Sequence, residues 1–224
     1  MRARTCAVIP AFLEGERIGP LVREAARHVA RVIGVADGSP DATGERAAAA
    51  GAEVVSHATN RGKGEAVRSG LARAEEAGYE WVLLMDGDGQ HNPADIPRLL
   101  RAAEDGSGDL LIGVRPLDGD STAARRVTNR IATRILSRWI GIPLRDSQSG
   151  FRLVRLEALR GIRLTSRRFE IETEMLLRLS RRGARLVEVP TSASGPPSRP
   201  SHLRPVRDVV RNCLYALGVR YLSR

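Results

Sequence analysis

The chain has few aromatic residues and only two cysteines. Phe, Trp and Tyr make up 4% of its 224 residues, which argues against a nucleic-acid platform that binds bases by stacking. Cys6 and Cys213 stand near opposite ends of the chain, without the spacing of a metal site or a disulfide framework. The sequence therefore predicts free thiols in a reducing compartment.

Long hydrophobic runs are also missing. No segment approaches the roughly 20 apolar residues that a membrane-spanning helix needs, because Arg or Gly interrupts each run within a few positions. The apolar stretch after Arg2 and Arg4 is interrupted by Pro10 and Glu14, which excludes the core of a signal peptide. We expect a mature cytoplasmic protein that is soluble or peripheral to a membrane.

Positive charge is abundant. The chain has 36 Lys and Arg against 26 Asp and Glu, a formal net charge of +10. This balance favours an anionic partner such as a phosphorylated metabolite, a nucleic acid or an acidic membrane surface. With 42% hydrophobic residues, the length suits one large domain with a core of its own.

Short aliphatic runs alternate with longer helical patterns, which is typical of βαβ units and a mostly parallel α/β sheet. Strands are predicted at 6–9, 32–36, 53–56, 81–85, 110–114 and 185–189, and helices at 17–30, 42–50, 63–77, 94–103, 123–140, 170–182 and 206–222. The stretch 191–201, TSASGPPSRPS, has the composition of a loop or flap.

The segment WVLLMDGDGQHNP, residues 81–93, ends a buried strand with two carboxylates. If the extended geometry continues, Asp86 and Asp88 share one face at the strand's carboxyl end, where open α/β sheets bind ligands. Their oxygens suit Mg²⁺ or Mn²⁺, although such pairs also occur in surface turns. His91, beside Pro93, is expected to shape the turn into the next helix.

Four polar segments elsewhere remain open between ligand contact and local structure. Asp37, in ADGSPDATG, also fits an ordinary βα turn. Lys63 stands between two glycines before a helix, as in a phosphate cradle, but its segment NRGKGEAVRSG matches neither the P-loop nor the dinucleotide fingerprint. Asp146, in RDSQSGFRLVR, lies in a polar loop before an apolar element. The glutamates of FEIETE, including Glu172, are read as charges at a helix start.

Taken together and in order, eight segments resemble the inverting family 2 glycosyltransferases, and within them the dolichol-phosphate mannosyltransferase-like branch that glycosylates polyprenyl phosphates. They are VIPAFLE, ADGSPDAT, NRGKGEAVRSG, MDGDGQHNP, TNRIATRILS, DSQSGFRLVR, FEIETEMLLRLSRRGARLVEVP and SHLRPVRD. The resemblance implies a GT-A fold, a mostly parallel Rossmann-like sheet flanked by helices, with a C-terminal helix. It also implies metal-dependent transfer from a GDP- or UDP-sugar to a polyprenyl phosphate, with no nucleic-acid partner.

The resemblance also implies a set of site residues. The donor would be bound by Pro10, Ala11, Glu14, Asp37, Lys63 and Asp86; a Mg²⁺ or Mn²⁺ ion by Asp86, Asp88 and Gln90; and the acceptor phosphate by Arg126, Arg130, Ser201, His202 and Arg204. Asp88 and Asp146 would carry catalysis. Because a phosphate acceptor is already ionised, Asp146 is expected to orient the sugar or stabilise the oxocarbenium-like state.

Three parts are expected along the chain: a GT-A domain at 1–190, a flexible acceptor-side loop at 191–203, and an amphipathic helix at 204–224. That helix either docks on an anionic membrane at the inner face or packs on the domain. Two positions depart from the family pattern: Leu13 stands for an asparagine, and Ala36 stands for the first of two aspartates. The second departure bears on nucleoside recognition.

Other functions remain as alternatives. A family 2 enzyme with a glycan or small metabolite as acceptor is the nearest, and a non-catalytic module that binds anionic lipid is more distant. A nucleotide-sugar pyrophosphorylase is disfavoured because PAFLEGERIG follows the first strand in place of a basic, Gly-rich loop. The donor base, the sugar, the acceptor and the oligomeric state stay open.

Overall fold

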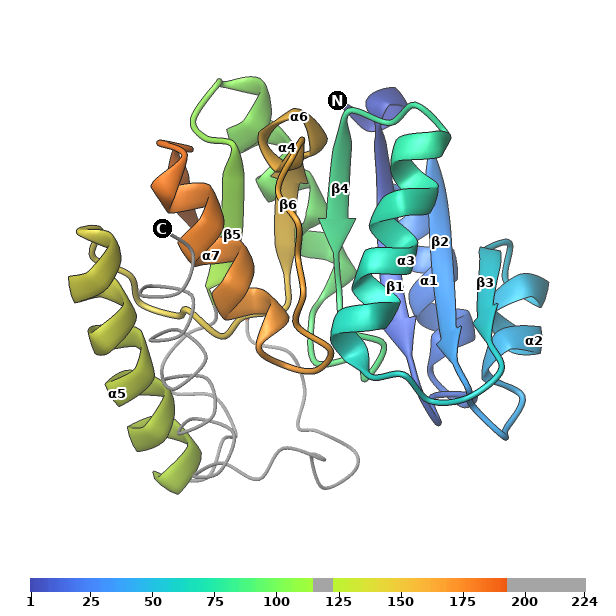
Figure 1. Ribbon diagram of the computed structural model, residues 1–224. Helices are drawn as coiled ribbons and strands as arrows, with labels where there is room; N and C mark the ends of the chain where they lie inside the picture. The colour runs from blue at the N-terminus through green and yellow to red at the C-terminus, as the bar shows by residue number, and fades with distance from the viewer. Residues whose placement is uncertain (115–122, 193–224) are drawn as a thin grey trace.

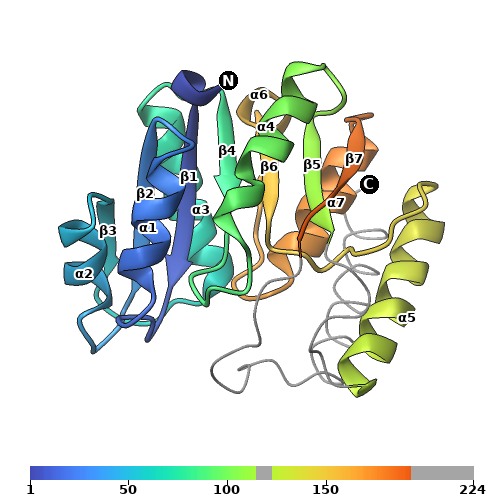
Figure 2. The ribbon, with the colours of Figure 1, turned by 180° about the vertical axis from the view of Figure 1, so that it is seen from behind.

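A seven-stranded sheet with helices on both faces forms the centre of the computed structural model, which describes residues 1–114 and 123–192 (Figures 1 and 2). The strands are β1 (Thr5–Ala11), β2 (Arg31–Asp37), β3 (Glu53–His57), β4 (Trp81–Leu84), β5 (Leu110–Val114), β6 (Arg152–Arg155) and β7 (Leu186–Pro190). Their order in the sheet is β3-β2-β1-β4-β6-β5-β7.

Seven α-helices and two short 3₁₀ segments are found among the described residues. They are η1 (Arg2–Arg4), α1 (Ile18–Ala26), α2 (Thr43–Ala49), α3 (Lys63–Glu76), η2 (Pro93–Asp95), α4 (Ile96–Glu104), α5 (Ala123–Ile140), α6 (Leu156–Leu159) and α7 (Ile171–Arg181). Helices α3 and α7 cover the face seen in Figure 1, and α1 and α4 cover the face seen in Figure 2.

Both faces of the sheet are buried because side chains alternate along the central strands. In β1, Ala7 and Ile9 join the core under α1 and α4, whereas Cys6 and Val8 join the core under α3 and α7. Burial raises the pKa of the Cys6 thiol to about 12, so this cysteine is an inert core residue.

The prediction of an α/β, mostly parallel sheet flanked by helices is confirmed, although some elements were missed or misplaced. Strand β6 was not predicted; it lies antiparallel between β4 and β5, and its sequence RLVR has an arginine at each end. The first helix was predicted to run to residue 30, four residues beyond its end at Ala26. The chain leaves α1 after Ala26, and Ala30 donates its amide N–H to the Thr5 carbonyl at the edge of the sheet.

Helix α5 packs beside α7 on the left of Figure 1, where Leu136 and Leu177 form a small apolar cluster. The other predicted C-terminal features, the loop at 191–203 and the helix at 204–224, lie outside the described residues apart from 191 and 192. Within the described ranges, no helix is both long and apolar enough to span a bilayer.

Candidate active site

The predicted donor-side residues meet at one edge of the sheet. Pro10 and Ala11 end β1, Asp37 ends β2, and Asp86 follows β4 by two residues. These three strands are parallel neighbours, so their carboxyl ends lie together at the lower edge in Figure 1. This is the edge at which open α/β sheets bind ligands.

The two aspartates follow β4 where the chain enters a turn. Strand β4 ends at Leu84, and the chain turns at Gly87 and Asp88, so the extended geometry does not continue through these residues as expected. The glycines and aspartates of this segment favour a turn over continued pairing. Asp88 Oδ1 accepts the backbone N–H of Gln90 at 3.0 Å. Burial and the nearby charge of Asp86 raise the pKa of Asp88.

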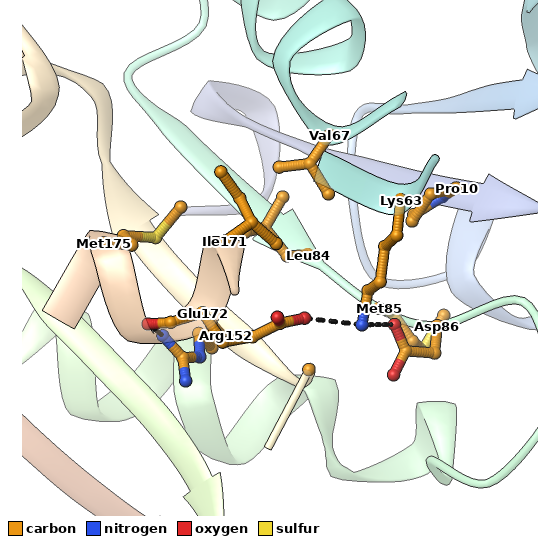
Figure 3. Close-up of a pocket in the computed structure, with 11 residues that line it drawn as sticks. Pro10, Lys63, Val67, Leu84, Met85, Asp86, Arg152, Ile171, Glu172 and Met175 are labelled. Carbon is orange, nitrogen blue, oxygen red and sulfur yellow. Dashed lines mark hydrogen bonds and ion pairs between the residues drawn. The ribbon is translucent and has the colours of Figure 1, made fainter. Parts of the chain in front are cut away.

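Lys63 joins Asp86 to a residue of α7 (Figure 3). Its ammonium Nζ lies 2.6 Å from Asp86 Oδ1 and 2.5 Å from Glu172 Oε1. Burial opposes the charges, but the lysine and His91 together hold the pKa of Asp86 well below its usual range. The two carboxylates likewise raise the pKa of Lys63 in spite of its burial. The Lys63 ammonium therefore lies between the carboxylates of Asp86 and Glu172.

Close packing surrounds Asp86 on its other sides. The buried His91 has its Nε2 3.7 Å from Asp86 Oδ2, and its ring stacks on Phe151 with 5.3 Å between ring centroids. A Cβ at Gly150 would collide with the Asp86 carboxylate. The loop before β6 thus approaches the turn after β4 because it carries a glycine at this point.

Asp146 lies in that loop and is 6% exposed. Its Oδ1 accepts N–H groups from Asn129 Nδ2 of α5 at 3.2 Å and from the Gln148 backbone at 3.0 Å. Glu188 of β7 accepts the backbone N–H groups of Arg145 and Asp146 at 2.6 and 3.1 Å. Residues of α5 and β7 therefore hold the Asp146 loop.

Arg152, the first residue of β6, anchors the same loop. Its side chain is fully buried, and its guanidinium donates to three backbone carbonyls: Ser149 at 2.7 Å, Ser147 at 2.8 Å and Glu172 at 2.7 Å. The loop and the start of α7 are thereby tied together. Sequence reasoning missed Arg152 as a site residue and treated Glu172 as a helix-start charge. An arginine directly before the apolar pair Leu153 and Val154 was the available signal for Arg152.

Asp37 is occupied by internal contacts. It is 3% exposed; its Oδ1 accepts the Arg61 N–H at 2.9 Å and lies 2.7 Å from His57 Nδ1, and its Oδ2 accepts the Gly62 N–H at 2.8 Å. These bonds fix the loop that leads into Lys63.

The remaining predicted residues differ in where they lie. Glu14 forms an ion pair with Arg17 at 2.9 Å, and Arg130 is exposed on α5. Ser201, His202 and Arg204 lie outside the described residues, as does the side chain of Arg126. The acceptor-side group therefore stays a prediction.

The carboxylates after β4 fit a metal that binds together with its substrate. No group of three or more His, Cys, Asp or Glu side chains within 1–114 and 123–192 is arranged to hold an ion. Mg²⁺ is usually held by one or two carboxylates, with phosphates and waters as the other ligands. A divalent cation would also relieve the repulsion that raises the pKa of Asp88.

Comparison with known proteins agrees with this geometry. The profile described as Glycosyl transferase family 2 matches residues 6–163. The chain belongs to this family. It is 35% identical over 209 residues to Glycosyltransferase AglJ of Haloferax volcanii, covering 91% of this chain and 67% of AglJ. It is 33% identical over 207 residues to the undecaprenyl-phosphate mannosyltransferase of Micrococcus luteus, covering 84% and 82%.

Solved structures share the fold of this family 2 member. The glucosyl-3-phosphoglycerate synthase of Mycobacterium tuberculosis, in complex with Mn²⁺ and UDP-glucose, aligns with a TM-score of 0.75 and 23% identity, covering 98% of this chain and 79% of that one. The same enzyme in complex with Mg²⁺ and UDP gives a TM-score of 0.77 at 23% identity, covering 96% and 80%. The GT-A glycosyltransferase architecture is thus shared.

Proposed function

We propose that this glycosyltransferase moves a sugar, with inversion, from a nucleoside-diphosphate sugar to the phosphate of a polyprenyl lipid, with Mg²⁺ or Mn²⁺. The observation that carries the proposal is the meeting of Asp86, Lys63 and the Asp146 loop at the carboxyl edge of the sheet. Relatives named for polyprenyl substrates support the acceptor class, among them the polyprenol monophosphomannose synthase of Mycolicibacterium smegmatis, 32% identical over 203 residues.

Each residue has a separate task in this reaction. Asp86 and Asp88 would hold the divalent ion, which offsets the charge that builds on the leaving diphosphate. Lys63, the first residue of α3, would donate to the diphosphate beside the ion. Asp146, whose carboxylate is held by Asn129 and the Gln148 amide, would face the positive charge that develops on the sugar ring.

The donor is tested first by thermal shift. GDP-mannose, UDP-glucose and UDP-N-acetylglucosamine are each added with and without Mn²⁺, and a true donor should raise the melting temperature by mass action. We expect one donor to do so, and to do so more strongly with Mn²⁺. If none changes the melting temperature, donor binding as proposed is contradicted.

The acceptor is then tested by transfer. With the donor so identified, mass spectrometry should detect a glycosylated short-chain polyprenyl phosphate. A small phosphorylated metabolite is the second candidate acceptor, because structures of the fold neighbour contain phosphoglyceric acid. Transfer to 3-phosphoglycerate but to no polyprenyl phosphate would decide for this second class.

We also infer that the protein works at the inner surface of a membrane. Helix α5 has five arginines and no acidic residue in its sequence, and it exposes Val127 by 52% and Ile131 by 48% beside the exposed Arg130 and Arg134. Apolar and basic side chains together are typical of a helix that contacts anionic headgroups. The C-terminal helix remains a second predicted contact.

Liposome flotation tests this surface. The protein should float with vesicles containing anionic lipid at low salt and be released at high salt. Val127→Ser with Ile131→Ser should weaken the binding, whereas Leu at both positions should preserve it. Absence of binding to any liposome would count against both the membrane surface and the lipid acceptor.

A further inference from the structure

Glu172 lies between the two halves of the candidate active site. Its carboxylate contacts Lys63, which also contacts Asp86 on the diphosphate side. Its backbone carbonyl accepts from Arg152, whose guanidinium also holds the Asp146 loop on the acceptor side. Figure 3 shows Glu172, Lys63 and Asp86 in one row, with Arg152 beside Glu172. In the proposed reaction, the transferred sugar must pass between these two sides.

The neighbouring residue strengthens this placement. Thr173 Oγ1 accepts a hydrogen bond from Gln148 Nε2 of the Asp146 loop at 3.3 Å. The first turn of α7 is therefore joined to that loop both by a side-chain bond and by the Arg152 guanidinium. Glu172 therefore stands on a helix turn that is fixed by these bonds and not on a flexible loop. A side chain that selects a ligand needs such a rigid support.

The Glu172 carboxylate has unused capacity to accept hydrogen bonds. In the part of the chain that the structure describes, Lys63 is the side chain that forms an ion pair with it. A carboxylate offers about four acceptor positions, and this one is 8% exposed. Lys63 also has three N–H donors, two of which are directed to Asp86 and Glu172. The pair thus combines free acceptor positions with a remaining donor, which suits a sugar hydroxyl.

We propose that Glu172, with Lys63 beside it, binds a hydroxyl group of the transferred sugar and selects the sugar by the orientation of that hydroxyl. The inference rests on the proposed function and adds a specificity-determining residue to it. A site built to hydrogen-bond a hydroxyl discriminates strongly against a sugar that lacks or inverts it, since the carboxylate is then left without its partner.

Glu172→Gln tests the proposal by donor binding, which does not depend on the acceptor. Calorimetry with Mn²⁺ compares the nucleoside diphosphate, the full donor, and a set of donors that each lack one sugar hydroxyl. We expect the variant to bind the free diphosphate as the wild type does and the full donor about tenfold more weakly. One deoxy donor should bind both proteins equally, which identifies the hydroxyl that Glu172 contacts.

Two further variants serve as controls for the Glu172→Gln experiment. Glu172→Asp keeps the charge and shortens the side chain, so the preference for the full donor should be reduced rather than lost. Glu65→Gln is a matched control on α3, because Glu65 pairs with Arg61 and Arg68; its preference among sugars should equal that of the wild type. Melting temperatures of all variants establish that they are folded.

The outcomes separate this inference from the proposed function. If the wild type binds no nucleoside diphosphate, the proposed function fails, and this inference with it. If the wild type binds the donor, but Glu172→Gln binds every deoxy donor in the same order as the wild type, only the sugar contact is overturned. Equal weakening for the free diphosphate and the full donor would also overturn it, since the contact would then be to phosphate.

Discussion

Glu172 and Glu174 stand two positions apart on α7, and both are buried, yet their surroundings differ. Glu174 accepts the backbone N–H and the hydroxyl of both Thr165 and Ser166, and it also accepts Arg178 Nε. Glu172 is paired with Lys63 at the edge where substrate is proposed to bind. A carboxylate whose acceptor positions are all occupied by protein donors, here called saturated, stabilises the fold. An unsaturated carboxylate still has acceptor positions for a ligand. Burial of a charge alone does not distinguish these two roles.

The hydrogen bonds to the Glu174 carboxylate lower its pKa. Burial by itself would raise this pKa, but the bonds from Ser166, Thr165 and Arg178 outweigh it and lower the value to about 2. The loop before α7 is therefore fastened by one ionised side chain.

The largest expected effect lies on the substrate side of this comparison. Asp88→Asn, and separately Asp86→Asn, should abolish metal-dependent donor binding and lower kcat/KM by about a hundredfold, because the ion on the diphosphate loses a ligand. Calorimetry with donor and Mn²⁺ measures the binding. The folds should survive, as judged by the melting temperature. Wild-type affinity in both variants would rule out the metal assignment.

The next largest effect is a loss of stability on substitution of Glu174. Glu174→Gln should lower the free energy of unfolding by about 2 kcal/mol, because charge-assisted bonds to Thr165 and Ser166 are weakened. Turnover per folded molecule should stay near that of the wild type. Chemical denaturation and an active-site titration measure the two quantities. A large loss of turnover in the folded variant would break the distinction drawn between Glu172 and Glu174.

The same residue predicts a pH dependence of stability. Its folded pKa of about 2 lies below the ordinary value of 4.5, so the contribution is fully present above pH 4.5 and is lost as the pH falls toward 2. The stability difference between wild type and Glu174→Gln should therefore narrow over this interval. A difference that stays constant down to pH 2 would show that the carboxylate charge is not responsible.

The smallest effect is expected from Asp146→Asn. The side chain keeps its size, and its Asn129 contact is changed rather than removed. Turnover should fall by about tenfold while the donor dissociation constant stays nearly unchanged, the pattern of an interaction made mainly in the transition state. Steady-state kinetics and calorimetry together provide the measurement. Wild-type turnover in this variant would exclude a catalytic contribution from Asp146.

Much of the fold was predictable because its signals are local. Helix α5 was predicted with the bounds that the structure has, and β5 likewise, since periodicity identifies a buried stripe or a buried strand. Strand β6 was not predicted because it is short and has an arginine at each end. Arg152 can be buried only because three backbone carbonyls accept its N–H groups. A local sequence pattern does not indicate hydrogen-bond partners that come from distant segments of the chain.

The sequence by itself determined the α/β class, the carboxylates after β4 and the lysine at the start of α3, because each depends on residue order within one segment. Tertiary structure alone decided that Lys63 lies between Asp86 and Glu172, and that Arg152 ties the Asp146 loop to α7. It also decided that Glu174 is saturated while Glu172 is not. These pairings depend on how α3, β6 and α7 pack against the sheet, and contacts between segments far apart in the chain leave no periodic trace in either segment.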